Sequence, residues 1–354
     1  MEISENFWRG RRVFLTGHTG FKGGWLALAL RRVGAQVFGY SLAPSTEPSF
    51  CNVLMVQEKI VHECGDIRDL ERMRAAIIAA QPTIVFHLAA QPIVRQAYAD
   101  PLETLSTNVM GTANLLQVLR ELEGLEAVIC VTSDKVYDNV EWDWPYRESD
   151  RLGGKEPYGV SKACCELVVE AFRRSYFQNS DKDVPLATVR AGNIIGGGDW
   201  SVDRLIPDAV RAFSNNEPVV IRNPLSVRPW QHVCEPVRGY LGLAQMMVSQ
   251  QRKAPETLNF GPPDEDVRTV GDLVNTFSAL WGDGVQWMHD DSVQAYEART
   301  LTIDSQIARR RLGWRPRWTF EQTLAHTVDW YKAYYSKASL EELTMSQLEQ
   351  ALFA

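Results

Sequence analysis

The first half of the chain alternates short, unbroken apolar runs with segments of helical periodicity. The apolar runs lie within residues 11–17, 36–41, 59–66, 83–90, 127–134 and 185–196. Helical patterns stand between them, as in residues 24–34, 70–80 and 157–177. Because the runs are continuous and do not alternate with polar residues, the strands must be covered on both faces. The pattern predicts an α/β fold with a doubly wound parallel sheet.

The second half of the chain has a different texture. From about Gly196 onward, loop-rich stretches such as GGGDW, RNPLSVRPW and NFGPPDED separate shorter elements. We therefore expect a Rossmann-type domain in residues 1–195, with returning segments near 233–260. Residues 196–354 are expected to form mainly a smaller, interleaved substrate lobe and C-terminal helices. The last stretch, SLEELTMSQLEQALFA, is predicted to be an amphipathic helix for packing or oligomer contacts.

Composition excludes several classes of protein. No apolar run approaches the roughly 20 residues that span a bilayer, and the N-terminus carries acids and no cleavage signal, so a cytoplasmic protein is expected. The net charge of −7 gives no reason to expect a nucleic-acid partner. The six cysteines lack a CxxC spacing and nearby histidine pairs, so we expect reduced thiols and no metal site.

A glycine-rich loop follows the first predicted strand directly. The stretch TGHTGFKGG places Gly17, Gly20 and Gly23 in a G-x-x-G-x-x-G spacing where a helix begins. Glycines allow a tight turn and close approach to a pyrophosphate, and a helix N-terminus offers free N–H groups. A glycine-rich structural turn is the alternative, but the order strand, loop, helix favours a dinucleotide site. The residues expected at the cofactor also include Thr19, Phe21 and Lys22.

The rest of the expected cofactor site follows the next strands. The second strand ends at Tyr40 and Ser41, where an acid that binds the ribose often stands. No arginine stands there to bind a 2′-phosphate either, so NAD is favoured but loosely held. Asp66 and Ile67 are expected at the adenine edge. Small or apolar side chains that end the fourth strand are expected beside the flat cofactor: Leu88, Ala89 and Ala90.

Tyr158 and Lys162 form a Y-x-x-x-K pair at the start of a predicted helix, so both project from one face. A lysine cation there can lower the pKa of the tyrosine and hold a nicotinamide ribose, which makes the phenol a usable base. The pair alone is common on solvated helices. It gains weight because it follows a strand that ends in Thr132 and Ser133.

These motifs resemble the extended short-chain dehydrogenase/reductase family. The resemblance covers most of the chain, through TGHTGFKG, HLAAQ, NVMGTANLL, VTSDKVY, YGVSK and RAGNIIG. It implies that the Thr132 hydroxyl binds substrate, that Tyr158 is the base and that Lys162 clamps the ribose. The pair Asp134-Lys135 and the stretch GFKGGW are similar to the nucleotide-sugar 4,6-dehydratases within that family.

The resemblance implies a reaction in three stages with NAD. Tyr158 removes the C4 hydroxyl proton as hydride leaves C4, a base removes the C5 proton while Asp134 protonates the departing C6 hydroxyl, and hydride returns to C6. Relatives acting on dTDP-glucose carry Asp-Glu where this chain has Asp134-Lys135. Lys135 as the C5 base must be neutral, which requires burial or a neighbouring cation such as Lys162. The alternative for the pair is a solvated turn with a surface ion pair.

The second half supplies candidates for substrate binding. Asn193 follows the sixth strand, and DRLIPD and RPWQHV resemble the nucleotide-sugar grip of the family. Guanidinium groups match phosphate oxygens, so arginines are candidates to bind a diphosphate. Each could instead be a surface charge, and the histidine could lie in the core. These candidates are Arg204, Arg228, His232 and Arg299. The resemblance alone favours a CDP-hexose as the substrate, and it implies a homodimer through residues 104–123 and 158–177.

Two other functions remain open at this point. A nucleotide-sugar C4-epimerase shares the glycine loop, the tyrosine and the lysine, but needs no acid beside the C6 hydroxyl, so Asp134 argues against it. A non-catalytic dinucleotide sensor on the same fold would be expected to lose Tyr158 or Lys162, and both are present.

Overall fold

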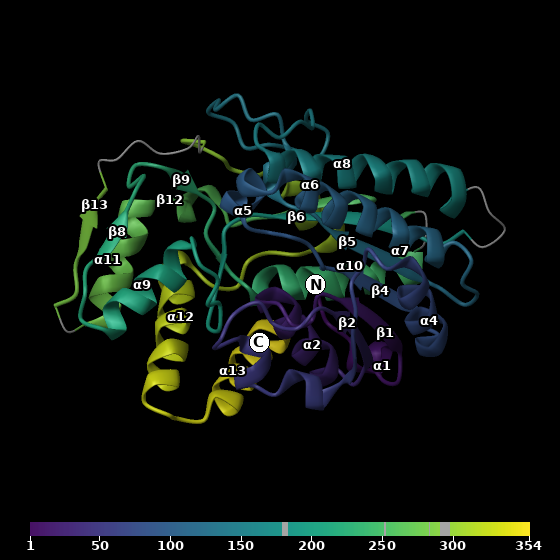
Figure 1. The fold of residues 1–354 in the computed structure, drawn as a ribbon, viewed down its shortest axis with the longest axis horizontal. Helices are drawn as coiled ribbons and strands as arrows, with labels where there is room; N and C mark the ends of the chain where they lie inside the picture. The colour runs from purple at the N-terminus through teal and green to yellow at the C-terminus, as the bar shows by residue number, and fades with distance from the viewer. Residues whose placement is uncertain (179–182, 251–252, 283, 291–297) are drawn as a thin grey trace.

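A seven-stranded sheet forms the centre of the protein (Figure 1). The computed structural model describes residues 1–178, 183–250, 253–282, 284–290 and 298–354. The sheet order is β11-β6-β5-β4-β1-β2-β3, and every pair is parallel. The strands are β1 (Arg12–Thr16), β2 (Gln36–Ser41), β3 (Val61–Cys64), β4 (Ile84–His87), β5 (Ala127–Val131), β6 (Leu186–Ala191) and β11 (Thr257–Phe260). The predicted fold class is confirmed.

Helices cover both faces of this sheet. The helices α2 (Phe21–Arg32) and α10 (Cys234–Gln250) pack in one buried cluster. The other cluster contains side chains of α4 (Leu70–Ala80), α7 (Gly111–Leu119) and α8 (Pro157–Phe172). Along β5, Ala127 and Ile129 belong to the first cluster, whereas Val128 and Cys130 belong to the second. Both faces of the strand are therefore apolar, which explains the unbroken runs.

Two segments of the second half return to the main sheet. The helix α10 contacts α2 and β5, and β11 pairs with β6 as the seventh strand. The stretch NFGPPDED, which begins at Asn259, reads as a loop, so sequence periodicity did not reveal this short strand. The last helix, α13 (Leu340–Phe353), packs against α10 and α12 (Phe320–Tyr335). Among the described residues, no helix has the length and apolar content needed to cross a bilayer.

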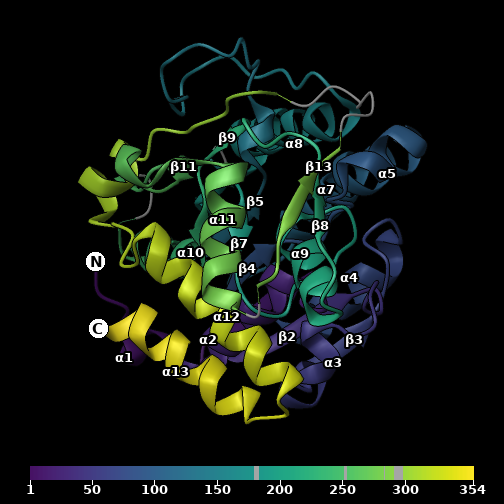
Figure 2. The ribbon, with the colours of Figure 1, turned by 90° about the vertical axis from the view of Figure 1, so that its left-hand side faces the viewer.

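A smaller lobe lies beside the sheet, at the left of Figure 1 and facing the viewer in Figure 2. Its helices are α9 (Leu205–Ser214), α11 (Val270–Trp281) and α12. Three short strand pairs complete it: β7 (Ile194–Ile195) with β10 (Gln231–His232), β8 (Val219–Ile221) with β13 (Trp287–His289), and β9 (Val227–Arg228) with β12 (Arg268–Thr269).

Short helices precede β1 or lie between the longer elements. They are α1 (Glu5–Trp8), α3 (Phe50–Val53), α5 (Val94–Ala99) and α6 (Pro101–Leu105). A π-type turn over Ser106–Met110 joins α6 to α7, so the helix expected from residue 104 onward is nearly continuous. A second π-type turn, Arg173–Phe177, extends α8 in the same way.

Candidate active site

A cleft of about 830 Å³ opens at the carboxyl edge of the parallel sheet. Its walls come from the segments that follow β1, β2, β4, β5 and β6, together with the smaller lobe. Ligands of doubly wound sheets bind at this edge. Most residues predicted at the site line the cleft: Gly17, Thr19, Gly20, Phe21, Lys22, Gly23, Ser41, Asp66, Ile67, Leu88, Ala89, Ala90, Thr132, Asp134, Lys135, Tyr158, Lys162, Asn193, Arg204 and Arg228.

The glycine loop is folded as a phosphate cradle. Gly17 has φ +80°, and a β-carbon on it would lie 2.6 Å from the Ala89 nitrogen. A β-carbon on Gly23 would lie 2.0 Å from the Gly17 carbonyl oxygen, so the loop and the first turn of α2 need both glycines. Gly20 caps α2 without a side-chain hydrogen bond. The first N–H groups of α2 are therefore free of a side-chain cap, which fits the pyrophosphate of a dinucleotide.

The expected ribose end of the cleft carries hydroxyl groups. The Ser41 and Thr19 hydroxyls lie 2.6 Å apart, and Thr19 also donates to the Leu42 carbonyl. The Asp66 carboxylate accepts hydrogen bonds from the Arg68 backbone and guanidinium, which lower the pKa of that carboxyl group. Asp66 is therefore oriented by a neighbour at the cleft wall, and the end of β2 supplies Ser41 instead of an acid.

Lys22 brings a titratable cation to the cleft. Burial lowers the pKa of Lys22 to about 7, and the positive charges of Arg204 and Lys162 act in the same direction, while Asp134 opposes them. The positive charges of Arg204 and Lys162 thus act on the Lys22 amine. An anion bound beside Lys22 would be attracted by all three cations.

We expect the affinity for a dinucleotide to fall as the pH rises through 7. Lys22 is charged below a pKa of about 7 and attracts the pyrophosphate, whereas it is neutral above that pH. A single such group gives at most about a tenfold loss of affinity per pH unit. Isothermal titration of NAD between pH 6 and 8 measures this dependence. The Lys22→Met variant should show a flatter profile, and an unchanged profile in this variant would assign the dependence to another group.

The start of α8 positions Tyr158. Pro157 stands at the first helical position, and the Glu156 carboxylate accepts from the backbone N–H groups of Tyr158 and Gly159. This cap begins the helix at the residue that the Y-x-x-x-K motif needs. Burial raises the pKa of Tyr158 to about 12, whereas its hydrogen bond with Ser133 acts to lower it.

Lys162 lies one turn further along α8 and is buried. Its ammonium group donates to the Val131 carbonyl at 3.2 Å, which ties the helix to the end of β5. Burial lowers the pKa of Lys162, whereas Cys165, Cys130 and then Glu166 on the next turn favour the protonated form. The lysine is thus held by the strand that delivers Ser133 and Asp134.

The hydrogen bonds of Thr132 do not favour the substrate contact predicted for it. Its hydroxyl donates to the Glu166 carboxylate at 2.5 Å and lies 3.3 Å from the Val189 carbonyl, so it is engaged with the protein interior. The hydroxyl that meets Tyr158 belongs to Ser133. Sequence reasoning missed Ser133, although its position directly before Asp134 was a signal. The strand ends at Val131 and a 3₁₀ turn begins at Asp134, so alternation along β5 did not predict which hydroxyl faces the cleft.

Asp134 is buried and lines the cleft. One carboxylate oxygen accepts from the Ser133 hydroxyl at 3.1 Å, and the other has no hydrogen-bond partner within the described part of the chain. A β-carbon on Gly192 would lie 1.9 Å from that second oxygen. The glycine that follows β6 therefore makes the space in which the Asp134 carboxyl group lies.

We expect Gly192→Ala to lower kcat about a hundredfold, because the new methyl group must displace the Asp134 carboxyl, and misplacement by about 1 Å has an effect of that size. Steady-state kinetics measure the loss, and NAD affinity should be nearly unchanged. In an Asp134→Ala background, the same substitution should have little further effect. A full further loss in that background would mean that Gly192 acts elsewhere.

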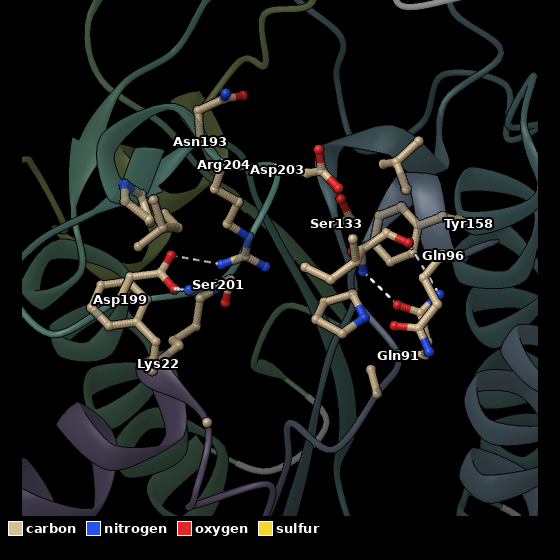
Figure 3. A pocket seen from close by; sticks show the side chains of 18 of the residues that line it. Lys22, Gln91, Gln96, Ser133, Tyr158, Asn193, Asp199, Ser201, Asp203 and Arg204 are labelled. Atoms are coloured by element: carbon tan, nitrogen blue, oxygen red, sulfur yellow. Dashed lines mark hydrogen bonds and ion pairs between the residues drawn. The ribbon is translucent and has the colours of Figure 1, made fainter. Parts of the chain in front are cut away.

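The opposite wall carries the predicted substrate residues (Figure 3). The Arg204 guanidinium donates to Asp199 at 3.0 Å and lies across the cavity from Ser133 and Tyr158. Asp199 also accepts from the Ser201 backbone, and Tyr331 donates to the Asp199 carbonyl. Asp199 was not predicted, because only the fold brings it against Arg204. Arg228 is oriented by hydrogen bonds to the Val227 and Ala298 carbonyls.

Two predicted substrate residues lie outside the cleft lining. His232 is fully buried and packs against Trp25 and Trp318, with ring centroids 5.7 and 4.7 Å away. Burial lowers its pKa, so it is a neutral core side chain. Arg299 is exposed, and its backbone N–H donates to Glu141. The structure therefore argues against a substrate contact by His232, which faces the core, whereas Arg299 directly follows Ala298 of the cleft wall and stays a prediction.

The Rossmann-type sheet, the glycine loop and the Tyr158-Lys162 pair define a short-chain dehydrogenase/reductase with an added smaller lobe. The sequence model of the family described as GDP-mannose 4,6 dehydratase matches residues 14–327, so the chain belongs to that family. It is 50% identical over 335 residues to the CDP-glucose 4,6-dehydratase of Salmonella typhimurium, which covers 94% of this chain and 93% of the relative.

Solved structures share the fold. A UDP-glucose 4-epimerase from Thermotoga maritima has a TM-score of 0.80 at 22% identity and covers 91% of this chain and 99% of its own. A dTDP-glucose 4,6-dehydratase from Bacillus anthracis in complex with NAD has a TM-score of 0.75 at 21% identity and covers 94% of this chain and all of its own. At these identities the likeness establishes the fold alone.

Proposed function

We propose that this protein converts CDP-D-glucose into CDP-4-dehydro-6-deoxy-D-glucose and water, with NAD as cofactor. The observation that carries the proposal is the meeting of Ser133, Asp134 and Tyr158 at one end of β5, beside the phosphate cradle. These three groups supply a hydroxyl for the C4 oxygen, an acid for the C6 hydroxyl and a base for the C4 hydroxyl.

The chemistry that NAD supplies is the acceptance of hydride from C4 and its return to C6. Ser133 and Tyr158 orient the C4 hydroxyl, and Tyr158 removes its proton. Oxidation at C4 makes the C5 proton acidic, and Lys135 lines the cleft as the proposed base for it. Asp134 gives a proton to the C6 hydroxyl, so that water leaves. C5 then takes a proton back, so that the two protons removed from the C4 hydroxyl and C5 equal the two given to the departing hydroxyl and to C5.

Two features support NAD as the cofactor. The glycine cradle at the start of α2 fits a pyrophosphate, and the proposed ribose clamp, Lys162, is held at the end of β5. The solved dehydratase of Bacillus anthracis is described in complex with NAD. The absence of an acid at Ser41 supports loose binding of the adenosine ribose.

The choice of a CDP-sugar is supported by the relative of 50% identity, which bears that substrate in its name. Arg204, on the wall opposite Tyr158, and Arg228, which also lines the cleft, are the proposed ligands of the diphosphate, because guanidinium groups match phosphate oxygens. Asn193 also lines the cleft and is proposed to bind a diphosphate or sugar oxygen.

A product analysis tests this function. The protein is incubated with NAD and with CDP-, dTDP- and GDP-hexoses, and the masses of the products are measured by mass spectrometry. Loss of one water from CDP-glucose without net NADH is the expected result. An unchanged mass with inverted C4 would favour a C4-epimerase, against which the acid Asp134 argues. No turnover of any sugar would favour a non-catalytic dinucleotide sensor.

We also propose that the protein forms a homodimer, and that different parts of the chain bind the cofactor and the substrate. Exposed apolar side chains lie on the helices near α6, α7 and α8, namely Leu102, Met110, Val160 and Leu167. Such residues support a helical contact with a second copy. Residues 1–195, with returning segments near 233–260, are proposed to bind the cofactor, and residues 196–354 mainly the substrate. Sedimentation analysis reports the oligomeric state.

A further inference from the structure

Glu166 is a buried carboxylate that the reaction described above does not use. It lies on α8, one turn beyond Lys162, and is 5% exposed. Its two oxygens accept from the hydroxyls of Thr132 and Thr188 at 2.5 and 2.7 Å. They also accept two hydrogen bonds from the Arg190 guanidinium, at 2.8 and 3.0 Å.

The charge of Glu166 is balanced where it lies. Burial alone would raise the pKa of Glu166, but the hydrogen bonds and charge of Arg190 lower it below its usual value. Arg190 is itself only 3% exposed. A buried ion pair of this kind contributes little net stability when intact, but it is strongly destabilising when one partner is removed. Its presence therefore suggests a geometric role.

The contacts of Glu166 tie together three elements. Thr132 follows β5, Thr188 and Arg190 project from β6, and Glu166 belongs to α8. Thr188 and Arg190 are two residues apart, so they face the same side of the sheet. Because Thr132 directly precedes Ser133, the position of its hydroxyl on Glu166 limits where the next residues of the chain can lie.

The same contacts span the two halves of the reaction centre. Ser133 and Asp134 come from the end of β5, whereas Tyr158 and Lys162 come from α8. Glu166 joins these two elements behind the cleft, and the Lys162 bond to Val131 joins them again nearer to it. Loss of either the Thr132–Glu166 or the Lys162–Val131 hydrogen bond should let the end of β5 shift relative to α8.

Arg190 carries the network onward to another wall of the cleft. It donates to the Tyr137 hydroxyl at 2.8 Å, and Tyr137 donates to Asn259 on β11 at 2.7 Å. Tyr137 lines the cleft three residues after Asp134. The segment that follows the catalytic residues is thus fixed by the same buried pair.

We propose that Glu166 is a positioning residue that holds the end of β5 against α8 through Thr132, and so sets the separation between Ser133 and Tyr158. Thr132 acts through this contact and does not touch the substrate. The inference rests on the proposed function of Ser133, Asp134 and Tyr158 in the same cleft.

Hydroxyl deletion tests the contact with little risk to folding. Thr132→Val keeps the shape of the side chain and removes the donor to Glu166, whereas Thr132→Ser keeps the donor. We expect Thr132→Val to lower kcat about tenfold with KM nearly unchanged, since small misplacements affect the chemical step. Thr132→Ser should restore kcat to within about twofold, and Ser133→Ala should lower kcat about a hundredfold or more. A Thr132→Val loss as large as that of Ser133→Ala, or no loss at all, would overturn the proposal.

A charge deletion provides a second readout. Glu166→Gln keeps an acceptor for Thr132 but removes the negative charge that favours protonated Lys162, so Lys162 should lose its proton at lower pH. The other titratable groups whose charges act with that of Lys162 stay in place: Cys130 on β5, Cys165 on α8, His87 on β4 and Lys22 on α2. In a plot of NAD affinity against pH, the loss of affinity at high pH should therefore begin at lower pH in Glu166→Gln than in the wild type. Lys22 is present in both proteins, so its own effect should be the same in both.

The two proposals fail in different ways. If the wild-type protein releases no water from any CDP-hexose, the proposed function is wrong, and the NAD-affinity profile still tests the link from Glu166 to Lys162. If Glu166→Gln does not fold, as thermal unfolding would reveal, the Thr132 pair decides alone. An unshifted NAD profile in a folded Glu166→Gln protein would contradict the electrostatic part of the inference.

Discussion

The Tyr158→Phe variant is expected to lose about a thousandfold in kcat. The substitution removes only the phenolic hydroxyl, and positioned acid-base groups contribute about 10² to 10⁴ in rate. The buried ring remains in place, because Tyr158 is 8% exposed and the Glu156 cap binds only its backbone. Release of water from CDP-glucose, followed by mass spectrometry in a single-turnover experiment, measures the loss.

Cofactor binding serves as the control for Tyr158→Phe. The cradle of Gly17 and Gly23 does not contain the phenol, so NAD affinity should stay within about threefold of the wild type. Burial raises the pKa of Tyr158 to about 12, so the wild-type rate should rise with pH as the phenol loses its proton, while the variant should lack this limb. A variant with more than a tenth of the wild-type rate would mean that Tyr158 is not the base.

The Lys135→Met variant is expected to lose about a hundredfold or more in water elimination. Lys135 lines the cleft directly after Asp134, and methionine keeps the length of the side chain without an amine. Oxidation at C4 does not require this amine, so the reduced cofactor should accumulate. Absorbance of NADH in a single turnover, together with exchange of the C5 proton in heavy water, measures the two steps separately.

Asp134→Asn is the matched control for Lys135→Met. It removes the acid for the C6 hydroxyl but leaves the proposed C5 base, so exchange at C5 should continue while water loss stops. The pair therefore separates proton removal from departure of the hydroxyl. If Lys135→Met exchanged the C5 proton at the wild-type rate, the assignment of Lys135 as the base would be wrong.

The features whose residues lie close together in the sequence were the easiest to predict. Continuous apolar runs identified the first six strands, because burial on both faces leaves no room for polar alternation. The glycine spacing and the Y-x-x-x-K motif each lie within a single loop or helix turn. Local geometry links their residues, so spacing and the order of neighbouring elements pointed to Gly17, Gly23, Tyr158 and Lys162, and all four line the cleft.

Prediction failed where the direction of a side chain depended on a distant partner. Thr132 and Ser133 are adjacent hydroxyls, and the sequence does not indicate that Glu166, 34 residues later, binds the first of them. His232 stands in a motif of polar and aromatic residues, yet it packs among tryptophans from remote parts of the chain. Asp199 became a candidate only through its bond to Arg204.

The sequence by itself determined the class of fold, the glycine loop and the Tyr158-Lys162 pair on α8, because each follows from periodicity or spacing within one element. Only the tertiary structure decided which hydroxyl meets Tyr158, which arginines line the cleft and how the Asp134 carboxyl finds space beside Gly192. The physical reason is that these choices depend on contacts between strands and helices far apart in the chain, whose energies no local pattern records.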